Sequence, residues 1–78
     1  KNVSLHGSQG AFIQGRIDDQ GVVHLHGPQG LSLHGNVRPD GHMSAQDPHG
    51  KYYHGTMDPS GHIDLHGPGG IHLHGAAS

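Results

Sequence analysis

The chain has 78 residues, of which 29% are hydrophobic, with eleven His, fifteen Gly, five Pro and no Cys. So few apolar residues exclude a large single core, and the lack of Cys excludes disulfides and thiolate metal sites. The formal net charge is −2 with His neutral, the four Lys and Arg do not cluster, and no apolar run is long enough for a membrane helix. We therefore expect neither nucleic-acid binding nor membrane spanning.

The sequence repeats with a period of twenty residues. Its units, at 2–21, 22–41, 42–61 and 62–78, align without a gap. A period of this kind is typical of folds that stack one small unit, which serve as scaffolds or binding surfaces more often than as enzymes. We treat 1–78 as a single repeat domain and expect no enzymatic activity, no catalytic residues and no small-molecule substrate.

Each unit contains two short runs of alternating apolar and polar residues, and four-residue groups ending in Gly separate the runs. In chain order these groups are GSQG, DDQG, GPQG, RPDG, DPHG, DPSG and GPGG. Pro in the second place sets φ for a type I turn, and the final Gly accepts the left-handed conformation that closes a hairpin with a bulge. Seven such turns predict eight strands and no helix.

The alternation agrees with the turn lengths, because residues opposite each other in a hairpin must share a face of the sheet. A three-residue loop at 28–30 places Leu25 opposite Leu33 and His24 opposite His34. The same construction pairs other apolar residues: Val37 with Met43, Met57 with Ile63, and Leu65 with Leu73. The pattern favours an all-β fold of four hairpin repeats in an eight-strand antiparallel meander, either as a single amphipathic sheet or as a closed barrel.

A second topology stays open at this point: a two-layer β-solenoid with one coil per repeat and parallel strands. The two topologies differ in which histidines they bring together. A solenoid would stack equivalent residues about 4.8 Å apart in two columns. The columns would be His34, His54 and His74, and His6, His26 and His66.

One face of the meander is apolar and has to be covered, by closure into a barrel or by other copies of the chain. We expect this assembly face to consist of Val3, Leu5, Ile13, Val23, Leu25, Leu31, Leu33, Ile63, Leu65, Ile71 and Leu73. A Gly also stands in mid-strand on this face in every unit, at positions 15, 35, 55 and 75. Such a Gly indicates a bend in the strand or the close approach of a second backbone.

In an open sheet the first and last strands, at 2–6 and 71–77, would offer unpaired backbone groups for strand addition. The leading functional hypothesis is therefore a structural, self-assembling protein, the subunit of an extracellular fibre or other ordered assembly, whose partners are other copies of itself. A different hypothesis is a designed or consensus repeat without biological function. The imperfect third unit, with Ala45, Gln46 and Asp47 in place of Leu-His-Gly, favours natural drift instead.

The other face carries nearly all the histidines. Imidazole is a common ligand of Zn, Cu and Ni, and two His at i and i+2 on a strand project from one face roughly 6.5 to 7 Å apart. Meander register places His54 opposite His66, His66 opposite His72, and Asp64 opposite His74. The alternative function is thus a histidine-rich metal-binding module with these candidate ligands: His54, His66, His72, His74 and Asp64, and further His24, His26 and His34.

The histidines have two other interpretations. Copying of a Leu-His-Gly element would produce a weakly charged solvent face without a specific role. Protonation of all eleven His would change the formal charge from −2 to +9, so the surface is also suited to a pH switch.

Overall fold

A computed structural model describes residues 1–7 and 10–78 of the chain. It is an all-β fold, as the sequence predicted, with eight strands: β1 (Asn2–Gly7), β2 (Phe12–Ile17), β3 (Val22–His26), β4 (Ser32–Val37), β5 (His42–Gln46), β6 (Tyr52–Met57), β7 (His62–His66) and β8 (His72–Ala77). Two single 3-10 turns, η2 (Pro28–Gly30) and η3 (Pro68–Gly70), join β3 to β4 and β7 to β8. Within the described ranges, no helix is long and apolar enough to cross a membrane.

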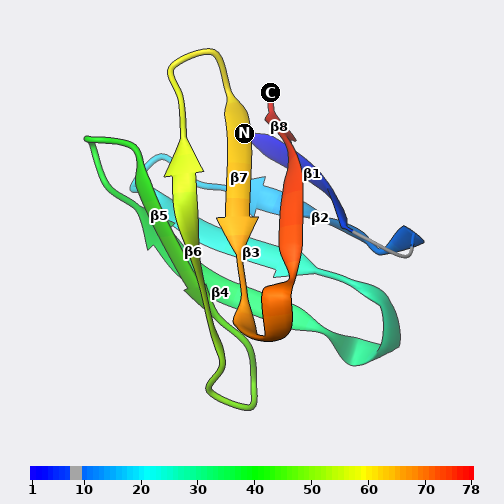
Figure 1. The fold of residues 1–78 in the computed structure, drawn as a ribbon. Coiled ribbons are helices and arrows are strands. Elements are labelled where there is room, and N and C mark those ends of the chain that lie inside the picture. Colours follow the sequence, from blue (N-terminus) through cyan, green and yellow to red (C-terminus); the bar gives the residue numbers. More distant parts are fainter. Residues whose placement is uncertain (8–9) are drawn as a thin grey trace.

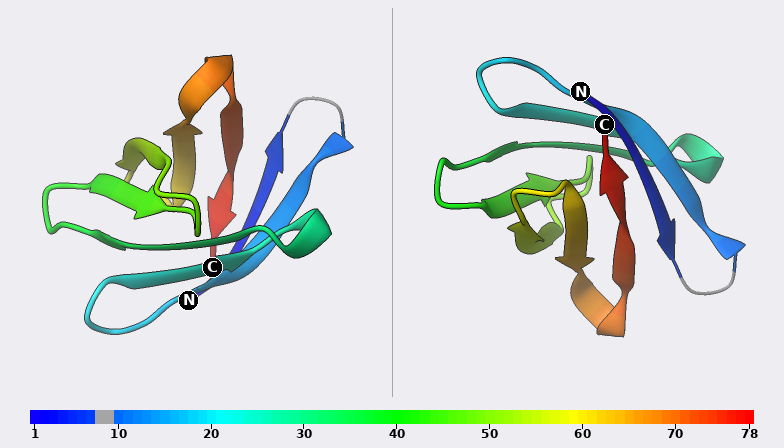
Figure 2. Two further views of the ribbon diagram at one scale, coloured as in Figure 1. Left: turned by 90° about the horizontal axis from the view of Figure 1, so that it is seen from below. Right: turned by 90° about the horizontal axis from the view of Figure 1, so that it is seen from above.

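The strands follow one another in sequence order around a closed antiparallel barrel, in which β1 pairs with β8 (Figure 1). The backbone N–H of Asn2 donates to the carbonyl oxygen of Ser78 at 2.8 Å, and that of Ser78 donates back to Asn2 at 2.7 Å. Both termini therefore lie at the same end of the barrel (Figure 2), here called the terminal end. The solenoid alternative is wrong, because every neighbouring pair of strands is antiparallel.

The predicted register is confirmed. The observed opposite pairs include Leu25 with Leu33, His24 with His34, Val37 with Met43, Met57 with Ile63, and Leu65 with Leu73. The turn predicted at GSQG contains Ser8 and Gln9, which lie outside the described residues. Turn length and alternation were sufficient for register because a shift of one residue would have turned apolar side chains out of the barrel.

The apolar face becomes the barrel interior. Nine of the eleven residues expected on the assembly face are buried, whereas Leu31 is partly buried and Ile71 is 37% exposed at the end opposite the termini. No polar or charged side chain is buried among the described residues. Closure thus covers the face within one chain. The predicted free edges at 2–6 and 71–77 are wrong, because these two segments pair with each other.

Aspartates shape three of the turns. Asp18 Oδ1 accepts hydrogen bonds from the backbone N–H groups of Gln20 and Val22, at 2.9 and 3.0 Å. Asp47 and Asp58 make the same pair of contacts in their own turns. The Gly that ends each turn has a φ of +83° to +97°, namely Gly21, Gly50 and Gly61. These are the predicted type I turns with a left-handed Gly.

The two Gly-Pro turns differ from that prediction. Gly27 and Gly67 have no carboxylate to accept the turn amides, and the chain closes each loop through a second left-handed residue. This residue is Gln29 in η2, with a φ of +60°, and Gly69 in η3, with a φ of +69°. A side chain is disfavoured in this region of φ, so η2 carries strain that η3 does not.

The mid-strand glycines mark the closest approach between strands. A Cβ on Gly15, Gly35, Gly55 or Gly75 would overlap the backbone carbonyl oxygen of His24, Ser44, Asp64 or Ser4, respectively. Each contact joins the second strand of one unit to the first strand of the next, with β8 and β1 making the fourth. The sequence prediction of close backbone approach is confirmed, and any larger residue would push two strands apart at a junction between units.

Replacing Gly35 by Ala should lower the free energy of unfolding by about 3 kcal/mol, because the new methyl group meets backbone, which cannot move aside cheaply. Urea unfolding followed by circular dichroism measures this change. Ser32→Ala, on the outer side of the same strand, is the control and should have little effect. A loss below about 1 kcal/mol for Gly35→Ala would contradict the described packing.

The two Gly-Pro turns allow a reciprocal exchange. Gln29→Gly should stabilise the barrel by about 0.5 to 1 kcal/mol, after allowance for the larger entropy of Gly in the unfolded chain. Gly69→Gln should destabilise it by a similar amount. Thermal unfolding of both variants checks the prediction, and the opposite order of stabilities would show that Gln29 is not strained.

Candidate metal centre

A first row of histidines crosses the outer wall of the barrel on β6, β7 and β8. His54 lies opposite His66, and His66 lies opposite His72. The rings of His66 and His72 stack in parallel, with centroids 4.5 Å apart and an interplanar angle of 3°. Both pairings were predicted from the turn lengths and are confirmed.

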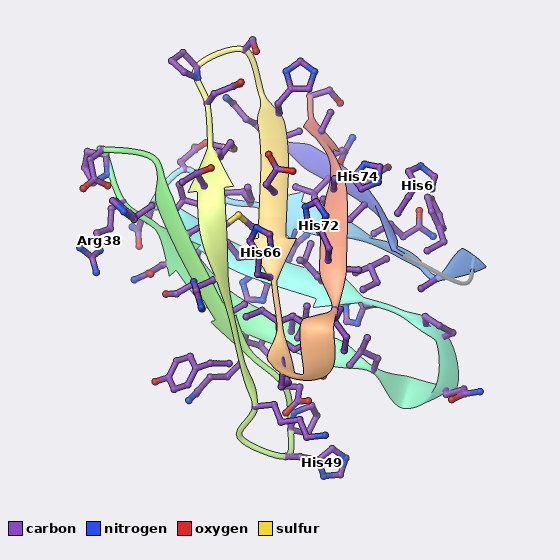
Figure 3. All side chains as sticks on the ribbon, in the orientation of Figure 1. His6, Arg38, His49, His66, His72 and His74 are labelled. Carbon is purple, nitrogen blue, oxygen red and sulfur yellow. The ribbon has the colours of Figure 1, made fainter. Side chains whose placement is uncertain are left out.

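A second row lies next to the first, on β7, β8 and β1. Asp64 lies opposite His74, as predicted, and His74 lies opposite His6 across the closure of the barrel. The rows are in contact, because His72 Nε2 is 3.3 Å from Asp64 Oδ1 and the rings of His72 and His74 are 5.6 Å apart. Figure 3 shows His66, His72, His74 and His6 following one another across this side of the molecule.

The second row borders a hollow of about 630 Å³ on the outer wall, where β8 meets β1. Small side chains form its floor, since Ser4 and Ala76 lie opposite each other there. Three imidazoles and two carboxylates line it, and no Lys or Arg does: His6, His62, His74, Asp58 and Asp64. The side chains that surround this hollow are therefore suited to a cation.

The upper rim of the hollow is ordered by the turn between β6 and β7. Asp58 accepts hydrogen bonds from the Ser60 hydroxyl at 2.7 Å and from the backbone N–H groups of Ser60 and His62 at 3.0 and 2.9 Å. Its Oδ2 lies 3.6 Å from His62 Nδ1. The Ser60 hydroxyl, followed by the backbone N–H of His62, lowers the pKa of Asp58 below its usual value. This carboxylate is therefore ionised at neutral pH.

Sequence reasoning missed three residues of the hollow: His6, Asp58 and His62. His6 joins the row only because β1 pairs with β8, and no turn length sets the register of that pairing. Asp58 was part of the DPSG turn, and His62 was one of the histidines of the polar face that no predicted pairing singled out. The signal that could have found them is the DPSG turn. Asp58, which accepts the amides of this turn, also lies 3.6 Å from the ring nitrogen of His62, the residue that follows the turn.

The remaining predicted ligands form a separate group on β3 and β4. The rings of His24 and His34 meet edge to face, with centroids 5.5 Å apart, and His26 lies in the neighbouring position of β3. The Arg16 guanidinium stands opposite His24 on β2, and a hollow lined by these residues contains no carboxylate. The structure thus separates these three predicted ligands from the other five, which lie on β6, β7 and β8.

The side chains of the hollow lie at the surface, with exposed fractions of 52% for Asp58, 58% for Asp64 and 75% for His62. As they lie, no three His, Asp or Glu side chains in the described part of the chain are placed to hold one metal ion. Coordination would require these exposed side chains to change rotamer, whereas the strands that carry them would stay in place.

Comparison of the chain with models of protein families, with curated proteins and with solved structures gave no match.

The lowered pKa of Asp58 has a consequence for stability. A carboxyl group whose pKa is lower in the folded than in the unfolded chain stabilises the fold above its unfolded pKa, and this contribution is lost as the pH falls through the folded pKa. We expect the Asp58 carboxyl to titrate below pH 3.8 in the folded protein. Stability should fall less steeply in acid for Asp58→Asn than for the parent chain.

Carbon-detected NMR of the Asp58 carboxyl against pH measures this pKa directly. Urea unfolding of both chains between neutral pH and pH 3 measures the linked change in stability. A folded-state pKa above 3.8 would contradict the hydrogen bonds described for this turn.

Proposed function

We propose that the chain is a histidine-rich module that binds a divalent transition-metal ion in the hollow between β8 and β1. The observation that carries the proposal is the lining of this hollow, which combines three imidazoles with two carboxylates and contains no Lys or Arg. Two carboxylate groups provide negatively charged oxygen ligands that suit a divalent ion. Imidazole and carboxylate together suit Zn, and imidazole also suits Cu and Ni.

Asp64, His74 and His6 are the ligands we assign first. They occupy directly opposed positions on three neighbouring strands, so each side chain is next to the following one. Adjacent opposed residues have Cβ atoms about 4.5 to 5.5 Å apart, and rotation about χ1 and χ2 brings side chains of this length toward a shared point. His62 is positioned to supply a further ligand from the rim, and water would complete the shell.

The stacked rings of His66 and His72 lie next to the assigned ligands and restrict the orientation of Asp64. His72 contacts Asp64 Oδ1, which leaves the second carboxylate oxygen for the metal. A His that binds a metal-ligating carboxylate orients that ligand and typically affects metal affinity about 10- to 100-fold. His66, stacked on His72, in turn restricts the rotation of the His72 ring.

Self-assembly remains a second proposal, but through a different surface from the apolar face that the sequence predicted. Nine of the eleven residues of the expected assembly face form the core of one barrel, so a fibre built on that face would require the barrel to open. Intact barrels would have to associate through the outer wall or through the end opposite the termini, where Ile71 is exposed. Phe12 and Tyr52 are the other exposed large hydrophobic residues described. The extracellular fibre stays a prediction.

Calorimetric titration of the metal-free protein with Zn, Cu and Ni at neutral pH tests the proposed site. We expect saturable binding of one ion per chain for at least one of these metals. His72→Ala should weaken it by about tenfold, as is typical for the partner of a ligating carboxylate. His74→Ala and Asp64→Asn should each weaken it more than His72→Ala does, because each removes an assigned ligand.

His49→Ala is the matched control, because His49 lies in the turn between β5 and β6, far from the hollow (Figure 3). It should leave the affinity unchanged. Circular dichroism of each variant establishes that the barrel is intact. Absence of saturable binding, or equal weakening by His49→Ala and His74→Ala, would overturn the proposal.

A further inference from the structure

The hollow between β8 and β1 lies where one repeat unit meets the next, and two further hollows on the described outer wall lie at other such junctions. A second lies between β4 and β5, and a third lies at the junction of β2 and β3. The mid-strand glycine of the junction contributes to each of them: Gly75, Gly35 and Gly15. The repeated backbone thus provides a hollow at each of these junctions, and the side chains around each hollow determine which ligand it suits.

The hollow at the junction of β2 and β3 has a volume of about 460 Å³. All of its polar side chains carry hydrogen-bond donors, and no carboxylate lines it: Asn2, Arg16, His24, His26 and His34. This is the reverse of the hollow beside β1 and β8, which two carboxylates line. The hollow between β4 and β5 is lined by one His together with amide and hydroxyl side chains, and no Asp, Glu, Lys or Arg lines it.

We propose that the hollow at the junction of β2 and β3 is an oxyanion-binding site, centred on the Arg16 guanidinium and suited to a phosphate group. It is independent of the proposed metal site, since the two hollows share no residue. A guanidinium presents parallel N–H groups that match two oxygens of a phosphate, and it stays charged at all physiological pH values.

The cross-strand register places the other donors beside Arg16. Asn2 lies opposite Arg16 on one side and His24 on the other, and His34 follows opposite His24. Each imidazole has at least one N–H in either tautomer, so His24 and His34 add donors without needing a second charge. Four neighbouring strands thus present amide, guanidinium and imidazole groups in a single row.

Arg16 forms no ion pair with a carboxylate in the described part of the chain, where the ion pairs are all between His and Asp. The nearest acidic residue along the chain is Asp18, two residues further, in the turn after β2. Its Oδ1 accepts the backbone N–H groups of Val22 and Gln20, which hold this carboxylate in its own turn and lower its pKa, and the charges of His24 and Arg16 lower that pKa further. Asp18 therefore lies in the neighbourhood of Arg16 without forming a direct ion pair with it, and the guanidinium N–H groups can still meet an anion from solution.

Titration of metal-free, ¹⁵N-labelled protein with inorganic phosphate, followed by amide chemical shifts, tests this site. The experiment is run at constant pH and constant ionic strength, with chloride replaced by phosphate. We expect saturable shifts confined to the row around Arg16, with a dissociation constant on the order of 1 mM for a single surface guanidinium supported by amide and imidazole donors. Acetate, which has less charge, should bind more weakly at the same place.

Arg16→Gln should abolish the saturable shifts, and Arg16→Lys should retain only part of the affinity, because a lysine lacks the paired N–H groups. Arg38→Gln is the matched control and should bind phosphate like the parent chain, since Arg38 lies in the turn between β4 and β5 (Figure 3). Shifts that do not saturate, that spread over the whole barrel, or that survive in Arg16→Gln would overturn the proposal. These outcomes leave the metal site untouched, because no metal is present.

Discussion

The close approach of neighbouring backbones at the mid-strand glycines is the constraint on which the rest of this structure depends. At each junction between units, the space that a Cβ would fill holds the carbonyl oxygen of the next strand, as for Gly35 and Ser44. Strands this close can bend enough for eight short segments to close on themselves. Without that bend, the chain would be the open amphipathic sheet that its alternating pattern also allows.

Closure of the barrel buries the apolar face of the sheet and leaves the histidine-bearing face on the outside. The buried side chains described belong to hydrophobic residues, Tyr53 among them, so the interior is a packed core without buried charged side chains. The chemistry of the molecule is confined to the outer wall, where ten of the eleven His stand on strands or at their ends. Closure also brings His6 beside His74, and so completes the row of side chains that borders the hollow between β8 and β1.

Periodicity predicted most of the fold, because the turn lengths and the alternation had to agree with each other. The pairing of His66 with His72 and of Asp64 with His74 followed from that agreement alone. The same reasoning does not extend to the pairing of β1 with β8, because no turn connects these strands and no loop length fixes their register. His6 was therefore missed, and the free edges were predicted where the structure has a paired junction.

The rest of the candidate site depends on differences between units that the repeat pattern conceals. Arg16 and Asp64 sit at outer-wall positions beside equivalent junctions, so a guanidinium lines one hollow and carboxylates line the other. A repeat aligned by its Leu-His-Gly element draws attention to the residues that are copied. In this barrel the residues that are not copied distinguish one hollow from another.

Nuclear Overhauser effects between β1 and β8 test the central claim, that one chain closes its own barrel, most directly. A sample that mixes differently labelled chains separates contacts within a chain from contacts between chains. The account predicts contacts between Ser4 and Ala76 and between His6 and His74, all within one chain. Their absence, or their appearance only between chains, would contradict closure and would return the apolar face and the edge strands to a role in assembly.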